Sequence, residues 1–289
     1  MSEQKWVDLH LHTTFSDGVF PPSEIVRMAK EAGMAAIAIA DHDNADGIGE
    51  AMQAGSQHGV EVISGVELSV VYEDFEDLHL LGYGFDPTHS ELQVALKEFR
   101  DFRASRNDHI VARVNEVLAK EGRDPLDFER VRSLAGGTFG RPHIAMALLE
   151  KGYARNTEEA FDRYLVPCNV SKRYFPIVEA MELIRSAGGI TVLAHPPFIT
   201  RDRDLLVKLL DRFTELGLTG VEAYNSGATN DEIDWYITLA RRRGLIVTGG
   251  SDFHGVDKDA IAIGRGRGNL RIPYACLEEI RSALAGVTE

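Results

Sequence analysis

The sequence predicts an α/β fold in which a parallel sheet closes into a barrel, with a helical segment inserted into it. Short apolar runs alternate with helical patterns in both outer parts of the chain, which is typical of a parallel sheet. Histidines and carboxylates follow these runs where strands should end, and barrels carry their chemistry at the carboxyl ends of strands. An open doubly wound sheet is the alternative fold, with ligands at the same strand ends.

The amino-terminal part, residues 1–89, is expected to supply the first strands of the barrel. Its expected elements are a strand over 5–12, a helix over 21–33, a strand over 35–40, a helix over 46–58, a strand over 60–64 that Gly65-Val66-Glu67 follows, and extended segments over 68–72 and 78–83. Proline near the start of the first helix and glycine at its end favour these boundaries. An acidic turn joins the last two segments.

The central part, residues 90–175, is expected to form a helical insertion, because no strand pattern interrupts it. Helices are expected over 90–121, 127–134, 141–151 and 157–165. In the last part, 176–289, strands expected over 189–194, 220–223 and 245–248 alternate with helices over 176–187, 202–216, 230–243 and 274–285. The expected domains are therefore a barrel of 1–89 with 176–289, and an inserted subdomain of 90–175.

Composition narrows the class of protein. The formal net charge of -14 over 289 residues argues against binding to long duplex nucleic acid, which needs a basic surface. A small phosphorylated substrate held by metal ions and a local basic pocket remains compatible with that charge. Two cysteines, Cys168 and Cys276, argue against a disulfide framework and favour a cytoplasmic protein. No signal peptide, membrane span or protein partner is expected.

Side chains suited to metal coordination recur at the expected strand ends and in the first loop. Alternate side chains of a strand face opposite sides, so His10 and His12 should point the same way, and histidine is the commonest metal ligand near neutral pH. Taken singly, each such residue is better explained as a polar loop group, but the set favours a metal centre. Its members are His10, His12, Asp17, His42, Glu67, His79, His195, Asp252 and His254.

This set exceeds the ligands that one ion needs, since a zinc site takes about four. It suits two or three divalent ions that share a bridging carboxylate. Nitrogen and oxygen ligands without thiolate suit manganese, zinc or iron, and the sequence leaves the identity open. Asp8 and Asp43 flank ligands, and would either orient imidazoles from behind or form ordinary strand-end hydrogen bonds.

The motifs that carry these ligands occur in a recognisable order. They are His10-Leu11-His12, Ser16-Asp17-Gly18, Asp41-His42-Asp43, Gly65-Val66-Glu67, His79, Ala194-His195-Pro196 and Gly250-Ser251-Asp252-Phe253-His254. In this order they resemble the polymerase and histidinol phosphatase (PHP) superfamily of metal-dependent phosphoesterases. The resemblance implies a distorted seven-stranded βα barrel with a trinuclear metal centre.

The resemblance also implies how the ligands would be shared. The first ion would take His10, His12, Glu67 and Asp252. The second would take Asp17, His42 and His254. The third would take His79 and His195, with Glu67 bridging to the first. Some relatives carry histidine at the position of Asp17, which leaves the identity and occupancy of the second metal open.

Motifs of the central part resemble the nucleotide phosphatase and 5′-3′ exoribonuclease branch of that superfamily. They are Gly140-Arg141-Pro142-His143-Ile144-Ala145 and Ala160-Phe161-Asp162-Arg163-Tyr164-Leu165. Arg141 and His143 are expected to clamp a substrate phosphate, with helix capping and surface charge as the alternative. Lys172 and Tyr174 are expected to form a second substrate-binding pair, in which Tyr174 either stacks on a base or packs in the core.

The expected activity is hydrolysis of phosphate esters of nucleotides by a metal-activated hydroxide. The substrates would be nucleoside monophosphates, 3′,5′-bisphosphates or the 5′ ends of short oligonucleotides. The expected catalytic residues are Asp17, His42, Glu67, His195, Asp252 and His254. One alternative is a phosphatase for another small metabolite such as histidinol phosphate, and another is a non-catalytic metal-bearing module.

Overall fold

The structure is a computed structural model that describes residues 4–134, 140–255, 261–268 and 270–287. The chain divides into two compact units, one of residues 1–96 with 174–289 and the other of residues 97–173. The domain boundaries expected at 90 and 175 stay a prediction. Within the described ranges, none of the helices combines the length and the apolar composition that a membrane span requires.

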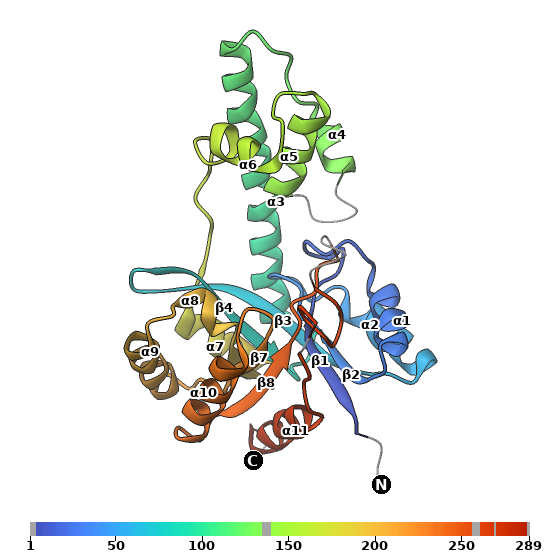
Figure 1. The fold of residues 1–289 in the computed structure, drawn as a ribbon, viewed down its shortest axis with the longest axis vertical. Helices are drawn as coiled ribbons and strands as arrows, with labels where there is room; N and C mark the ends of the chain where they lie inside the picture. The colour runs from blue at the N-terminus through green and yellow to red at the C-terminus, as the bar shows by residue number, and fades with distance from the viewer. Residues whose placement is uncertain (1–3, 135–139, 256–260, 269, 288–289) are drawn as a thin grey trace. The chain divides into compact units, whose positions relative to one another are not determined.

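The first unit is built on one strongly curved sheet (Figure 1). Its strands follow the order β1 (Trp6–Leu11), β2 (Met34–Ile39), β3 (Glu61–Tyr72), β4 (Phe75–Tyr83), β6 (Ile190–Leu193), β7 (Gly220–Asn225) and β8 (Ile246–Gly250), and β5 (Phe175–Pro176) pairs with β3. The chain after β8 returns to β1, because Asp252 N donates to His10 O and His12 N donates to Phe253 O, both at 3.0 Å. The expected α/β barrel is therefore confirmed as a nearly closed one.

One strand departs from the expected parallel sheet. Strand β4 runs antiparallel to both β3 and β6, whereas the other neighbours along the path are parallel. The cause is local: Tyr72 of β3 pairs directly with Phe75 of β4, so only Glu73 and Asp74 connect the two strands. A two-residue connection can join only antiparallel neighbours, and the positive φ of 50° at Glu73 suits such a hairpin turn.

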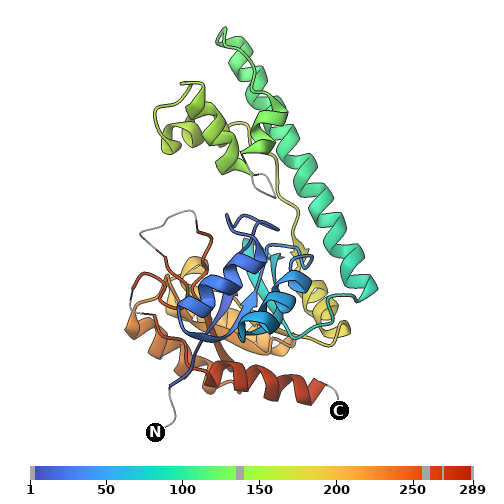
Figure 2. The same cartoon turned by 90° about the vertical axis from the view of Figure 1, so that its right-hand side faces the viewer.

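Helices cover the outer face of the sheet. They are α1 (Pro22–Glu31), α2 (Ile48–His58), α7 (Ile177–Ser186), α9 (Arg203–Glu215), α10 (Asn230–Arg241) and α11 (Ala275–Val287), with the short α8 (Pro196–Ile199) directly after β6. Leu11 of β1 and Ile37 of β2 share an apolar core with Ile25 of α1 and Ala51 of α2. Helix α11 lies at the end of the barrel where β1 begins, as both views show (Figures 1 and 2). The opposite end, where β1 finishes, carries the polar side chains.

The described residues of the second unit form helices joined by turns and loops, with no strand among them, which confirms the helical character of the insertion. Its elements are α3 (Ser90–Lys120, of which the first turns belong to the first unit), α4 (Phe128–Ser133), α5 (Arg141–Glu150), α6 (Thr157–Ala160) and a π-helical turn at Phe161–Leu165. Ile110 and Val114 of α3 pack with Leu148 and Tyr164 in a buried core of the unit's own.

Candidate metal centre

The centre is organised around the buried carboxylate of Glu67. Oε2 lies 3.0 Å from His42 Nδ1 and 3.3 Å from the Nε2 atoms of both His10 and His12. Oε1 lies 2.9 Å from His79 Nδ1 and 2.9 Å from His195 Nε2. One carboxylate therefore meets imidazoles that come from β1, β4, the end of β2 and the end of β6.

Glu67 does not follow a strand that ends at residue 64, as the sequence predicted. It lies within β3, which continues past it into the hairpin with β4. Asp43 N donates to Glu67 O at 2.9 Å, and Glu67 N donates to Asp41 O at 3.2 Å, so the chain after β2 pairs with β3 at this level. His79 likewise lies within β4, opposite Ser69, and reaches the centre because β4 runs in the reverse direction.

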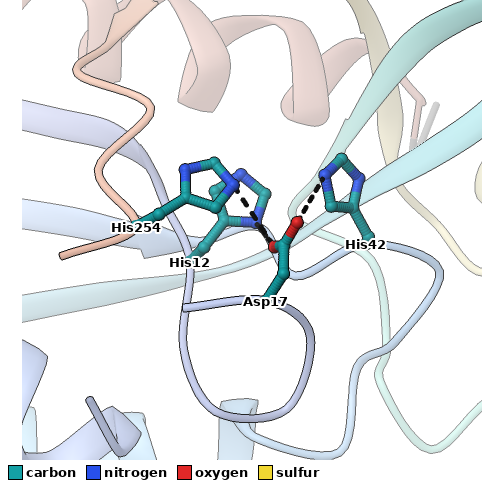
Figure 3. A group of neighbouring side chains, drawn as sticks. All are labelled: His12, Asp17, His42 and His254. Atoms are coloured by element: carbon teal, nitrogen blue, oxygen red, sulfur yellow. Dashed lines mark ion pairs between the residues drawn. The ribbon is translucent and has the colours of Figure 1, made fainter. Parts of the chain in front are cut away.

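A second group surrounds Asp17, whose side chain is 46% exposed (Figure 3). Its Oδ1 lies 3.2 Å from His254 Nε2 and 3.6 Å from His12 Nδ1, and its Oδ2 lies 3.7 Å from His42 Nε2. Asp252 completes the ring, with Oδ1 3.1 Å from His12 Nε2. All nine residues that the sequence singled out as ligands thus meet in one cluster, and their roles as ligands stay a prediction.

The donor set fits divalent cations. Three groups bring their ligand atoms within 4.8 Å of one another: His12, Asp17, His42 with His254; His10, His12 with Glu67; and His42, Glu67 with His79. Glu67 Oε2, His42 Nδ1 and His195 Nδ1 are buried without a hydrogen-bond partner among the described residues. Leaving such buried atoms without a hydrogen bond costs free energy. A coordinated cation would satisfy both Glu67 Oε2 and His42 Nδ1.

Neighbouring charges shift the pKa values of the side chains in the cluster strongly. Burial would lower the pKa of His10, but Glu67, Glu222 and Asp252 together raise it well above its usual value. Burial would raise the pKa of Glu67, but the surrounding imidazoles, His42 first, hold it well below its usual range. The carboxylates are therefore ionised at neutral pH, as metal coordination requires.

Two predicted ligands have a left-handed backbone that non-glycine residues rarely adopt. The φ angles are 23° at His195 and 56° at Asp252. His195 lies shortly after β6, which ends at Leu193, and Asp252 lies shortly after β8, which ends at Gly250. Such conformations cost of the order of 1–3 kcal/mol each and occur preferentially at functional sites. Here they turn both side chains inward at the point where β6 and β8 end.

Glu222 is a buried member of the site that the sequence analysis missed. It lies within β7, accepts from His195 N at 2.7 Å and lies 2.9 Å from His10 Nδ1. It therefore holds the ring nitrogen of His10 that faces away from Glu67. A signal was present, because Gly220-Val221-Glu222 repeats the Gly-Val-Glu triplet that contains Glu67.

Buried carboxylates next to the predicted ligands accept hydrogen bonds that fix the backbone around the centre. Asp41 accepts from Thr13 N at 2.7 Å and from the Ser16 hydroxyl at 2.5 Å, which fixes the loop that carries Asp17. Asp8 accepts from Ser251 N at 2.8 Å and Gly264 N at 2.7 Å. Asp8 thus anchors the segments after β8 in place of orienting an imidazole.

Asp43 accepts from the backbone N and hydroxyl of Ser69, at 2.8 Å and 3.0 Å. These contacts tie the chain after β2 to β3.

Both cysteines are buried, and burial raises the pKa of the Cys276 thiol to about 12. A raised thiol pKa leaves little of the reactive thiolate near neutral pH.

The expected substrate-binding residues are placed as follows. Arg141 begins α5 and holds its guanidinium 5.6 Å from the centroid of the Phe161 ring. His143 Nδ1 accepts from Gly140 N at 3.0 Å, which is the capping contact that the alternative interpretation expected. Lys172 and Tyr174 are half-buried, the former in the second unit and the latter in the first.

Comparisons with known proteins agree with this geometry. The family model described as the PHP domain matches residues 8–166. A 5′-3′ exoribonuclease of Haemophilus influenzae is 34% identical over 253 residues, covering 86% of this chain and 90% of that protein. A 3′,5′-nucleoside bisphosphate phosphatase of Chromobacterium violaceum is 30% identical, over 86% of this chain and 87% of its own. A solved structure from Bifidobacterium adolescentis, assigned as a metal-dependent phosphoesterase, has a TM-score of 0.78 at 29% identity and covers 97% of both chains.

Proposed function

The chain belongs to the PHP domain family and is a metal-dependent phosphoesterase, and we propose that its substrates are nucleotides. The substrates would be nucleoside monophosphates, 3′,5′-bisphosphates or the 5′ end of short oligonucleotides. The observation that carries the metal-dependent activity is the Glu67 carboxylate, which five imidazoles approach while Oε2 lacks a hydrogen-bond partner among the described residues. The choice of nucleotides is supported by the relatives named as an exoribonuclease and a nucleoside bisphosphate phosphatase.

We propose that two or three divalent ions occupy the cluster, with manganese, zinc and iron as the candidates that suit nitrogen and oxygen ligands. The overlap of the three ligand groups at Glu67, His12 and His42 supports more than one ion. His10, His12, Glu67 and Asp252 would hold the first ion, and Asp17, His42 and His254 the second. His79 and His195 would hold the third together with Glu67.

Ions held there would supply Lewis acidity toward a phosphoryl oxygen and would make water a nucleophile near neutral pH. The protein's own residues do the remaining work. Glu67 and Asp252 contribute negative charge that balances the ions, and Glu222 orients His10. Asp17 and His254 border the solvent-exposed side of the cluster, where a substrate phosphate would arrive.

Substrate recognition is proposed for Arg141, His143, Lys172 and Tyr174. The planar donor fork of Arg141 suits phosphate, and its stacking on Phe161 supports a fixed orientation. The Nδ1 contact with Gly140 N holds the imidazole of His143 at the first turn of α5, beside Arg141. A cytoplasmic location and the absence of membrane or long duplex partners stay predictions.

The function is tested by phosphate release from a panel of substrates after loading with manganese. The panel holds a nucleoside monophosphate, a 3′,5′-bisphosphate, a 5′-phosphorylated oligonucleotide and histidinol phosphate. We expect the nucleotides to be hydrolysed, and Glu67→Gln to lower kcat/KM by at least about 100-fold, because loss of a carboxylate ligand weakens metal binding. Glu73→Gln, in the turn of the same hairpin, is the matched control and should retain activity.

Bound metal measured by elemental analysis should fall in Glu67→Gln and stay unchanged in Glu73→Gln. Turnover of histidinol phosphate alone would replace the nucleotide proposal by a metabolite phosphatase. Bound metal without turnover of any substrate would instead favour a non-catalytic module.

A further inference from the structure

A pocket of about 610 Å³ lies beside the metal centre within the first unit. Its lining residues come from α8 and the segments after β7 and β8, and include Phe198, Arg201, Ser226, Gly227, Thr229 and Arg267. None of these residues belongs to the predicted metal ligands or to the predicted substrate-binding residues.

The pocket shares its wall with the metal cluster. The ring of Phe198 meets the imidazole of His195 edge-on, with centroids 5.3 Å apart. On the other side, the Ser226 hydroxyl donates to Ser251 O at 2.6 Å, directly before Asp252 in the chain. The pocket therefore borders the cluster through Phe198 on one side and Ser226 on the other.

Phe198 is an exposed aromatic ring that is held in place. Its relative exposure of 65% is unusual for phenylalanine, yet its backbone N donates to His195 O at 3.0 Å. A Cβ at position 227 would lie 2.8 Å from the tip of the ring, so the ring packs directly against the backbone of Gly227. An exposed and positioned ring offers a flat surface on which a nucleobase can stack.

The two arginines of the pocket differ in their contacts. Arg201 is engaged in the wall, because Nη1 donates to Glu232 Oε1 at 2.5 Å and Nη2 to Gly227 O at 3.3 Å. Arg267 is exposed and forms no ion pair with any described residue. On a chain with a net charge of -14, an exposed guanidinium that forms no ion pair with a described residue suits an anionic ligand.

We propose that this pocket binds the nucleoside part of the substrate, with the base stacked on Phe198 and the next phosphate paired with Arg267. The inference rests on the proposed function and deepens it. The preferred substrate would then carry a second phosphate beyond the reacting one. That group is either the 3′-phosphate of a bisphosphate or the first internucleotide phosphate of an oligonucleotide.

The test compares ratios of kcat/KM in the metal-loaded protein. Adenosine 5′-monophosphate and ribose 5-phosphate differ only by the base, and the wild-type protein should prefer the former. Phe198→Ala should reduce this preference by roughly tenfold, in line with the usual contribution of base stacking, while Phe198→Tyr should retain it because the ring face remains.

Arg267→Gln should lower the preference for adenosine 3′,5′-bisphosphate over the monophosphate, and a 5′-phosphorylated dinucleotide identifies which source of the second phosphate is favoured. Val178→Ala and Arg185→Gln, both exposed on α7, are the controls and should leave all ratios unchanged.

The outcomes separate the inference from the proposed function. If neither ribose 5-phosphate nor any nucleotide is hydrolysed by the wild-type protein, the proposed function fails. If nucleotides are hydrolysed but Phe198→Ala and Arg267→Gln leave both ratios unchanged, the pocket inference is overturned. Loss of the base preference in Phe198→Tyr as well would also overturn the stacking role.

Discussion

The residue that links the two sides of the metal centre is Glu222. Its carboxylate contacts the ring of His10 from β1 and the backbone N of His195 after β6. Carboxylates placed behind a ligand in this way typically change metal affinity by 10–100-fold when they are removed. The contact is buried completely, so water cannot replace it readily.

We therefore expect Glu222→Ala to weaken metal binding by roughly 10–100-fold, whereas Glu222→Gln should retain part of it, because the amide oxygen still accepts a hydrogen bond. The measurement is a metal titration of the stripped protein, with Glu215→Gln, exposed at the end of α9, as control. Equal affinities in Glu222→Ala and the wild-type protein would contradict the role assigned to this carboxylate.

His254 makes the metal-free protein sensitive to pH. Burial would lower its pKa, but the hydrogen bond and charge of Asp17, with Asp252, raise it to about 9. A histidine whose pKa is higher in the folded protein stabilises the fold when it is protonated. This contribution is fully present below the unfolded pKa of about 6.5 and is lost as the pH rises through about 9.

The metal-stripped wild-type protein should therefore exceed His254→Gln in free energy of unfolding at pH 6, and the difference should shrink by pH 10. Urea unfolding at a series of pH values measures both. Adding metal at pH 8 should also release protons, since a coordinated imidazole must be neutral. A difference that is constant with pH would show that His254 does not carry the predicted charge.

At the scale of elements, the closest approach lies where the barrel closes. A Cβ at Gly250 of β8 would fall 2.0 Å from His10 Cβ of β1. His10 therefore packs directly against the backbone of Gly250, where a side chain would not fit, and its imidazole reaches the metal centre from there. The same two elements are joined beyond β8 by the hydrogen bond from Asp252 N to His10 O.

Gly250→Ala should accordingly destabilise the protein by about 1–3 kcal/mol or more, the usual cost of overpacking a core, and should reduce bound metal. Gly49→Ala in α2 is the matched control: nothing lies within 4 Å of the added Cβ, and alanine favours a helix. Thermal unfolding compares the two variants. A Gly250→Ala protein as stable as the wild type would contradict the close packing of β1 against β8.

At the scale of the whole molecule, the proposed metal ligands and part of the proposed substrate-binding residues fall in different compact units. The proposed ligands all belong to the first unit, while Arg141 and His143 belong to the second, which has a buried core of its own. A substitution in the second unit should therefore act on substrate affinity without changing the metal content.

Arg141→Ala should raise KM for a nucleotide by roughly tenfold, as expected when a charged hydrogen bond to phosphate is removed, and leave bound metal unchanged. Arg130→Ala, whose guanidinium pairs with Glu150 on the surface of the same unit, is the control. Steady-state kinetics and elemental analysis provide the two readouts. Unchanged kinetics in Arg141→Ala would remove this residue from the substrate site.

Much of the fold could be predicted from local patterns. The long helix expected over 90–121 is observed at Ser90–Lys120, and the first strand, expected over 5–12, is observed at Trp6–Leu11. These elements can be predicted because they depend on the spacing of apolar residues and on residues that begin or end helices. Both signals act over only a few positions of the sequence. The membership of the family likewise follows from short motifs in order, since each motif carries its own chemistry.

Only the tertiary structure decided the reverse direction of β4, the position of Glu67 inside a strand and the part played by Glu222. The direction of β4 follows from the pairing of Tyr72 with Phe75 across a two-residue turn. The part played by Glu222 depends on partners far apart in the sequence: His10 and Glu222 are 212 positions apart, and they meet because the sheet curves until β8 reaches β1. The residue types in the sequence indicate which side chains can bind a cation. Which of these side chains lie close enough to bind the same cation depends on the closure of the sheet. That closure comes from hydrogen bonds and packing between strands that no local pattern specifies.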